Sequence, residues 1–241
     1  MTDALGSRAV FSVLMPATNA VVEPDMASLR PTGVTNQTYR FPFPALPDTV
    51  EGLMDLMRST LDLALACEPD RIVVAYTLEY MPNGVTAAPR LRDFVQAAVG
   101  LPTTMASDAV PKALKMLGAH RIGLVTPFGQ AANRNVEAYF AALGFCVARA
   151  VGFSSAQKGR AYTARITEAE VRDAFARVDT PDVEVLLQVG TALVCAGFVA
   201  DLEAHHGKPV IAVNTATYWL ALRQHGIADS VDGHGVLLLT H

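Results

Sequence analysis

The sequence predicts an α/β fold in which two pseudo-symmetric, doubly wound parallel-sheet lobes enclose a site between them. Two observations support this prediction. Short apolar runs alternate with longer helical patterns along the 241 residues. Landmarks of the first half also return in the second half in the same order, at offsets of 107 to 114 residues. The alternation indicates parallel sheets covered by helices, and the repeat indicates two homologous lobes.

The predicted strands are short runs of apolar and β-branched residues, which is the pattern of parallel strands buried on both faces. They are Val10–Met15, Arg71–Tyr76, Arg121–Val125, Phe145–Val151, Val183–Val189 and Pro209–Val213.

Helical patterns fill the intervals between these strands. In the first of them, Leu53, Met57 and Leu61 recur at four-residue steps and so share one face. Thr167, which is followed by acidic residues, has the character of a helix N-cap. The predicted helices are Asp48–Ala66, Gln130–Leu143 and Glu168–Val178.

The repeat sets the expected domain organisation. Pro16 and Pro127 each end a strand and lie 111 residues apart, and Tyr76 and Gly190 occupy matching strand ends 114 residues apart. We therefore expect an N-terminal lobe over residues 1–115 and a C-terminal lobe over residues 116–214. The final segment, 215–241, is expected to pack back on the N-terminal lobe.

Composition and charge exclude several classes of protein. Apolar residues make up 51% and charged residues 17%, which excludes intrinsic disorder. The net charge of −4 leaves no basic excess for nucleic acid or for a membrane surface. The first residues lack the basic, then apolar, pattern of a signal peptide, and the three cysteines form no disulfide framework. We expect a cytoplasmic protein, and the apolar content suggests a homo-oligomer of two or more chains.

The strand ends indicate where a ligand binds. In open α/β sheets, ligands lie at the carboxyl ends of the strands, close to helix N-termini whose N–H groups favour anions. Four loops, at residues 16–19, 76–80, 126–129 and 190–193, would then surround one central cleft. We expect this cleft to bind a small carboxylic acid, and no histidine spacing suggests a metal.

Two motifs resemble a known family. The segment MPATNAVVEPDMASLRPTGVTNQTYRF contains Pro16, Asn19, the acidic pair around Pro24, and Gly33. The segment GKPVIAVNTATYW covers residues 207–219. Together they resemble the maleate isomerase and arylmalonate decarboxylase group of the aspartate/glutamate racemase superfamily. The resemblance implies a two-lobed fold, a cofactor-free enzyme and a small dicarboxylate or malonate substrate.

In this family one or two cysteines at the matching strand ends do the chemistry, and the resemblance places them at Tyr76 and Gly190. A tyrosine of the family corresponds here to Phe128. Cysteine chemistry is therefore not expected, and a lyase reaction (decarboxylation, elimination or hydration) is the leading hypothesis. A cysteine isomerase or racemase and an inactive carboxylate-binding protein are the alternatives.

The candidate catalytic residues are Tyr76, Thr77 and Glu79, with Tyr76 acting as a general acid or base. The candidate substrate-binding residues are Pro16, Thr18, Asn19, Thr126, Phe128, Gly190, Thr191 and Asn214. Three of the candidates carry simpler interpretations as well, because Asn19 can cap a helix, Tyr76 can merely fill space and Glu79 can be a solvated loop acid. All three cysteines, Cys67, Cys146 and Cys195, are expected to be buried, unreactive thiols.

Overall fold

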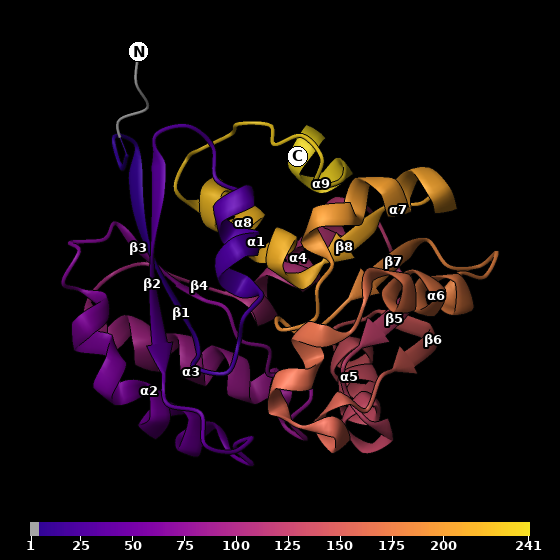
Figure 1. Ribbon diagram of the computed structural model, residues 1–241, viewed down its shortest axis with the longest axis horizontal. Helices are drawn as coiled ribbons and strands as arrows, with labels where there is room; N and C mark the ends of the chain where they lie inside the picture. The colour runs from indigo at the N-terminus through magenta and orange to yellow at the C-terminus, as the bar shows by residue number, and fades with distance from the viewer. Residues whose placement is uncertain (1–4) are drawn as a thin grey trace.

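The computed structural model describes residues 5–241, except for the side chain of Arg160. Two parallel sheets of four strands each form the two lobes, which stand side by side in Figure 1. The N-terminal sheet contains β1 (Ala9–Pro16), β2 (Val34–Phe41), β3 (Arg71–Val74) and β4 (Thr103–Met105) in the order β2-β1-β3-β4. The C-terminal sheet contains β5 (Arg121–Thr126), β6 (Cys146–Gly152), β7 (Val185–Gln188) and β8 (Val210–Ala212) in the order β6-β5-β7-β8. Both sheets thus have one topology, which confirms the predicted two-lobed α/β fold.

Helices cover both faces of each sheet. The helices up to the end of the N-terminal lobe are α1 (Val22–Ser28), α2 (Val50–Ala64), α3 (Gly84–Val99) and α4 (Ala106–Met116). The later α-helices are α5 (Gln130–Ala142), α6 (Glu168–Val178), α7 (Val199–His206), α8 (Val213–Gln224) and α9 (Val236–Thr240). Short 3₁₀ turns occur at Ser155–Lys158, Arg160–Arg165 and Ala196–Phe198. Within residues 5–241, no helix has both the length and the apolar character needed to cross a membrane.

The sequence predicted six of the eight strands within residues 5–241 and missed β2 and β4. β2 lies at the edge of its sheet, so most of its side chains are partly exposed and polar, and no continuous apolar run marks it. β4 has only three residues. The three predicted helices correspond to α2, α5 and α6. Thr167 caps α6 as expected, and it forms a complete capping box with Glu170.

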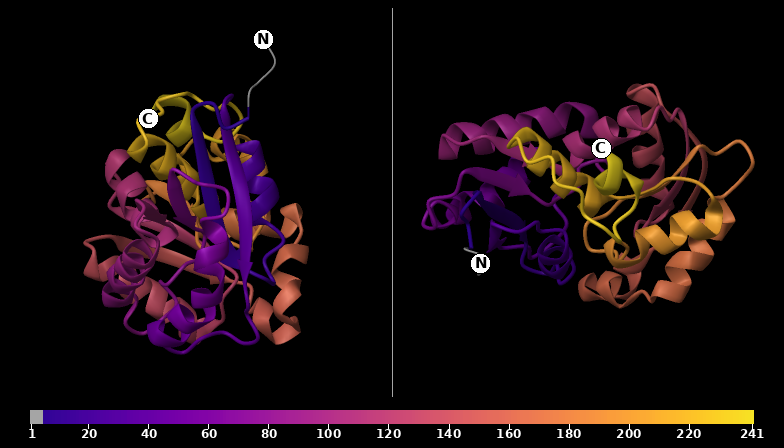
Figure 2. Two further views of the ribbon diagram at one scale, coloured as in Figure 1. Left: turned by 90° about the vertical axis from the view of Figure 1, so that its left-hand side faces the viewer. Right: turned by 90° about the horizontal axis from the view of Figure 1, so that it is seen from above.

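A single apolar core joins the lobes. Alternate residues of the strand β5 point to opposite faces, so Ile122 and Leu124 enter a core that also contains Val13 and Val73 of the N-terminal sheet. Val125 enters a smaller core under α6 and α7. Seen from above in Figure 2, the helices α4 and α8 lie between the two sheets. The lobes are therefore not independent bodies with separate cores.

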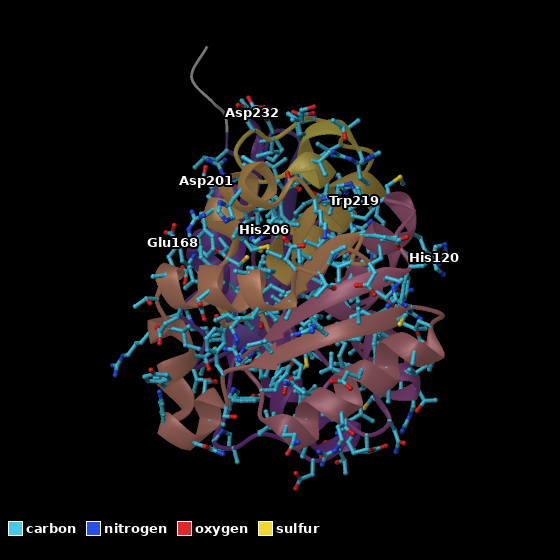
Figure 3. All side chains as sticks on the ribbon, turned by 90° about the vertical axis from the view of Figure 1, so that its right-hand side faces the viewer. His120, Glu168, Asp201, His206, Trp219 and Asp232 are labelled. Atoms are coloured by element: carbon cyan, nitrogen blue, oxygen red, sulfur yellow. The ribbon has the colours of Figure 1, made fainter. Side chains whose placement is uncertain are left out.

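The C-terminal segment contacts both halves of the molecule. The helix α8 packs on α4 and on the strands β3 and β4, in the N-terminal lobe. Beyond it, the Val236 N–H donates to the Glu203 carboxylate of α7, at 2.8 Å. Figure 3 looks at the molecule from the C-terminal lobe, with His120 and Glu168 at opposite edges of that lobe. The expected N-terminal lobe began at residue 1, and residues 1–4 lie outside the described part.

Candidate functional site

A cavity of about 230 Å³ lies between the lobes, at the carboxyl ends of the strands. All four loops named from the sequence contribute to its wall. The wall residues from these loops are Pro16, Thr18, Asn19, Tyr76, Thr77, Tyr80, Pro127, Phe128, Gly129, Gly190, Thr191 and Ala192. The cavity wall therefore contains both pairs that the repeat matched, Pro16 with Pro127 and Tyr76 with Gly190.

Two wall segments escaped the sequence analysis. Phe43 and Leu46 follow the strand β2, and Ser155, Ala156 and Thr163 follow the strand β6. β2 and β6 hold equivalent places at the edges of their sheets, so the repeat itself could have indicated these segments. Each segment follows a strand end, as the other wall loops do.

Aromatic rings form one side of the cavity. Tyr76 packs edge-on against Phe43 with ring centroids 5.8 Å apart, and Tyr80 lies 5.6 Å from Phe128. The hydroxyl oxygens of Tyr76 and Tyr80 are 2.7 Å apart, and the Tyr80 hydroxyl donates to the Pro47 carbonyl at 3.2 Å. Burial raises the pKa of Tyr76 well above its usual value and that of Tyr80 to about 12. Both phenols are therefore neutral at physiological pH, which argues against a role for Tyr76 as a base.

Polar groups from both lobes form another part of the cavity wall. The Asn19 amide oxygen accepts hydrogen bonds from the N–H groups of Val21 and Val22, at 2.9 and 3.1 Å. Its amide nitrogen therefore faces the other lobe and donates to the Thr191 hydroxyl oxygen at 3.1 Å. Asn19 therefore lies in the cavity wall and binds two N–H groups at the start of α1, although the N-cap position itself is Val21. Because the Thr191 hydroxyl oxygen accepts the hydrogen bond from Asn19, the hydroxyl proton remains available to donate to a ligand.

Thr77 adds a second hydroxyl to the cavity wall. It is buried in the cavity wall, and its hydroxyl forms no hydrogen bond with any described residue. No wall side chain that the structure describes carries a charge. Any anion in the cavity would be held by neutral O–H and N–H donors.

Three residues expected at the site are placed outside the cavity wall. The Thr126 hydroxyl is fully buried and interacts with the Asn133 side chain and the Phe128 N–H. Asn214 lies behind Thr191 and donates to its carbonyl at 3.0 Å. Glu79 is not a solvated loop acid, because it is completely buried.

The environment of Glu79 is unusual for a carboxyl group. Neither carboxyl oxygen has a hydrogen-bond partner of good geometry among the described residues. Burial raises the pKa of Glu79 to about 7, although nearby backbone N–H groups and the Ser107 hydroxyl oppose the shift. Glu79 is therefore a buried group that titrates near neutral pH, behind the wall rather than in it.

No cysteine lines the cavity. Cys195 is buried in the smaller core, where burial raises the pKa of its thiol, as expected for an unreactive cysteine. Cys67 is partly exposed and Cys146 is exposed, so the expectation that both are buried is wrong. Gly190 has a φ of +105°, and a Cβ atom there would lie 2.5 Å from Pro127 Cδ. A cysteine at Gly190 would therefore require the backbone or Pro127 to move.

The described residues also contain no group of three or more His, Cys, Asp or Glu side chains arranged to hold a metal ion. The groups available for chemistry in the cavity are hydroxyls, amides and aromatic rings.

Comparison with solved structures supports the fold. A variant of the maleate cis-trans isomerase of Nocardia farcinica, with a covalently bound succinylcysteine intermediate, superposes with a TM-score of 0.88. It is 21% identical, and the match covers 99% of this chain and 100% of that one. The maleate isomerase of Pseudomonas putida S16 superposes with a TM-score of 0.82 at 19% identity, over 98% of this chain and 99% of that one.

Comparison of sequences shows the family. The arylmalonate decarboxylase of Bordetella bronchiseptica is 30% identical over 147 residues, which are 59% of this chain and 60% of that protein. The match thus spans less than two thirds of that relative's length. The family profile described as arylmalonate decarboxylase matches residues 78–238. Since this match covers more than half of the sequence, and the fold agrees, the chain belongs to the arylmalonate decarboxylase family.

Proposed function

We propose that this chain is a lyase that removes a carboxyl group from a small carboxylic acid bearing an apolar substituent. One observation carries the proposal: a single cavity joins an aromatic wall, a tyrosine hydroxyl and a cluster of neutral hydrogen-bond donors. The aromatic wall would hold the substituent, and the donors would hold a carboxylate.

The donors suit a charge that develops during the reaction. The hydroxyls of Thr18, Thr77 and Thr191 line the cavity from both lobes. Fixed neutral donors stabilise an enediolate, in which negative charge spreads over two oxygens, without the reorganisation that water requires. The apolar surroundings disfavour a second carboxylate, which favours its loss.

The chemical step needs one proton donor. The C–C bond to the departing carboxylate breaks, CO₂ leaves, and the electron pair stays on the substrate as the enediolate. Tyr76 donates its hydroxyl proton to the resulting carbanionic carbon. The Tyr80 hydroxyl, whose oxygen lies 2.7 Å away, then turns from the Pro47 carbonyl and donates to the tyrosinate until Tyr76 regains a proton from water.

The cavity offers no thiol for the cysteine-based alternative. Cys195 is enclosed in the smaller core, and neither Cys67 nor Cys146 belongs to the cavity wall. Elimination and hydration would use the same carboxylate site, and a carboxylate-binding protein without turnover would use it as well. These alternatives are outcomes of the test below.

The test is turnover followed by proton NMR in D₂O. Wild-type protein is incubated with 2-methyl-2-phenylmalonate, phenylmalonate, malate and maleate, and we expect decarboxylation of the two malonates. Tyr76→Phe should lower the rate by about 10²-fold or more, as for loss of a general acid. Phenylacetate should still bind to that variant. Tyr39→Phe, on the edge strand β2, is the matched control and should retain activity.

Other results would redirect the proposal. Binding of phenylacetate with no product from any substrate would favour a non-catalytic binding protein. Conversion of maleate into its trans isomer would favour isomerase chemistry, and dehydration of malate would favour elimination. Full activity of Tyr76→Phe would remove Tyr76 from the mechanism while leaving the decarboxylase proposal in place.

A further inference from the structure

Thr191 is held at two points by residues of different elements. Its hydroxyl oxygen accepts a hydrogen bond from the Asn19 amide, and its carbonyl accepts one from the Asn214 amide at 3.0 Å. Thr191 is buried in the cavity wall and directly follows Gly190, whose positive φ turns the chain. The orientation of its hydroxyl and N–H toward a ligand therefore depends on these two contacts.

The orientation of Asn214 depends in turn on an acid. The Asn214 amide nitrogen also donates to a carboxylate oxygen of Asp25, at 2.7 Å, so both of its protons are in use. The Asn214 amide oxygen is buried and has no partner among the described residues. Both acceptors oppose a flip of this amide, because a flip would bring the Asn214 oxygen against the Asp25 carboxylate and the Thr191 carbonyl.

Asp25 lies in the first turn of α1, where an acid also suits the helix N-terminus. It is partly buried and does not line the cavity, so it can act on a ligand only through its neighbours. We propose that Asp25 is a positioning residue, whose carboxylate fixes the Asn214 amide so that Thr191 presents its donors to a carboxylate ligand. This inference rests on the proposed function for its consequence in binding, but the coupling of Asp25 to Thr191 stands on the contacts alone.

The ionisation of Asp25 provides a way to observe this coupling. Burial raises the pKa of Asp25 to about 6, against the opposing hydrogen bond from Asn214. The Cys195 thiol, in the loop after β7, lies near Asp25. Burial raises the pKa of this thiol, so it stays neutral between pH 5 and pH 8. Charged groups on neighbouring elements include Arg40 on β2, which pairs with Glu23 on α1 at 2.6 Å, Arg30 just after α1, and Arg172 on α6, which acts on the Cys195 thiol. Protonation of Asp25 should weaken its hold on Asn214, because the hydrogen bond is then no longer charge-assisted.

The first measurement uses no ligand. Backbone ¹⁵N–¹H spectra of the wild type are recorded from pH 5 to 8, and the Thr191 and Ala192 N–H signals and the Asn214 side-chain NH₂ signals should titrate together near pH 6. Asp25→Asn should abolish this titration, because its side chain has no charge to lose. Asp173→Asn, an exposed acid on α6, is the matched control and should leave it unchanged.

The second measurement uses phenylacetate as the probe. Its affinity for the wild type should fall about three- to tenfold from pH 7.5 to pH 5, the loss expected when a charge-assisted hydrogen bond becomes a neutral one. Asp25→Asn should show a clearly smaller change in affinity than the wild type over this range. The pKa of Glu79, about 7, also lies within this pH range. The contribution of Asp25 is therefore the difference between the affinity change of the wild type and that of Asp25→Asn.

The two measurements separate the two proposals. If the wild type binds no phenylacetate, malonate or maleate, the proposed function fails, and the ligand-free titration still decides the coupling. If Thr191 fails to titrate with Asn214 in the wild type, or still titrates in Asp25→Asn, the positioning role of Asp25 is overturned even when the enzyme is active. The wild-type spectra alone decide whether Thr191 and Asn214 titrate together, even if the variant does not fold.

Discussion

Glu79 lies in the loop that contributes Tyr76, Thr77 and Tyr80 to the cavity, but protein encloses its own carboxyl group completely. Ser107 lies beside it, with a hydroxyl oxygen that accepts a hydrogen bond from the Leu78 N–H at 3.2 Å. A buried carboxyl group without a cationic partner costs folding free energy once it is ionised. The cost should be visible as a pH dependence of stability.

The substitution Glu79→Gln tests this cost. The folded-state pKa of Glu79 is about 7, above its ordinary value of 4.5, so its contribution to stability is present at low pH and is lost as the pH rises through 7. The wild type should lose about 2 kcal/mol more than Glu79→Gln between pH 5.5 and 8.5. Urea unfolding at both pH values measures the difference, and Asp62→Asn, an exposed acid on α2, is the control. Equal losses in wild type and variant would show that Glu79 is not ionised within the fold.

Gly190 shows how the local backbone restricts the chemistry of the site. Its φ of +105° is a conformation that side chains disfavour, and the Pro127 ring occupies the space of a Cβ atom. At Gly190 the cavity wall therefore consists of backbone atoms and has no side chain that could react. The reactive hydroxyl of the proposed mechanism comes from Tyr76 on the opposite lobe.

At the scale of elements, the helix α6 begins with a complete capping box. The Thr167 hydroxyl oxygen accepts from the Glu170 N–H at 3.3 Å, and the Glu170 carboxylate accepts from the Thr167 N–H at 2.8 Å. The same helix buries Val171 and Phe175 in the smaller core, under the strands β5 and β7. The cap fixes where the helix starts and thereby which face it presents to the sheet.

The substitution Thr167→Ala should lower the free energy of unfolding by about 1 kcal/mol, the usual cost of losing an N-cap side chain. Urea unfolding followed by circular dichroism measures this loss. Thr240→Ala, an exposed threonine near the C-terminus whose hydroxyl only bonds back within α9, is the control and should change stability by less than about 0.5 kcal/mol. If Thr240→Ala lowered the free energy of unfolding as much as Thr167→Ala, the N-cap side chain of Thr167 would contribute no more to stability than an exposed threonine.

At the scale of the whole molecule, the lobes share one core and are further joined by polar contacts. The Tyr139 hydroxyl on α5 donates to the Ser107 carbonyl on α4 at 2.9 Å. The Asn135 amide, also on α5, donates to the Tyr80 carbonyl at 2.8 Å and so holds the cavity loop of the other lobe. Burial of these contacts and the continuous core should make the two lobes unfold together.

The substitution Tyr139→Phe tests this coupling. It removes one buried hydrogen bond between the lobes and should cost about 1 kcal/mol. Fluorescence of Trp219, the single tryptophan, reports on α8, and circular dichroism reports on both lobes. The two transitions should stay coincident in wild type and variant, with the variant shifted to lower urea. Two separate transitions in the wild type would show that the lobes unfold independently.

Two parallel sheets could be predicted from the amino-acid sequence, because buried parallel strands are continuous apolar runs. The repeat of landmarks such as Pro16 and Pro127 predicted equal topologies for both halves. It also named the four loops whose residues line the cavity. It could not reveal β2, whose edge position leaves its side chains half-exposed and polar.

The packing of the two lobes determines which of the predicted polar residues line the cavity and which lie behind its wall. Thr77 and Thr191 line the cavity, whereas Glu79 and Asn214 lie behind it, although all four follow strand ends in the sequence. The link from Asp25 through Asn214 to Thr191 joins residues far apart in the chain. Strand-end position predicts proximity to a site, but the direction in which a side chain points, and the acceptor that fixes it, depend on contacts between the packed lobes.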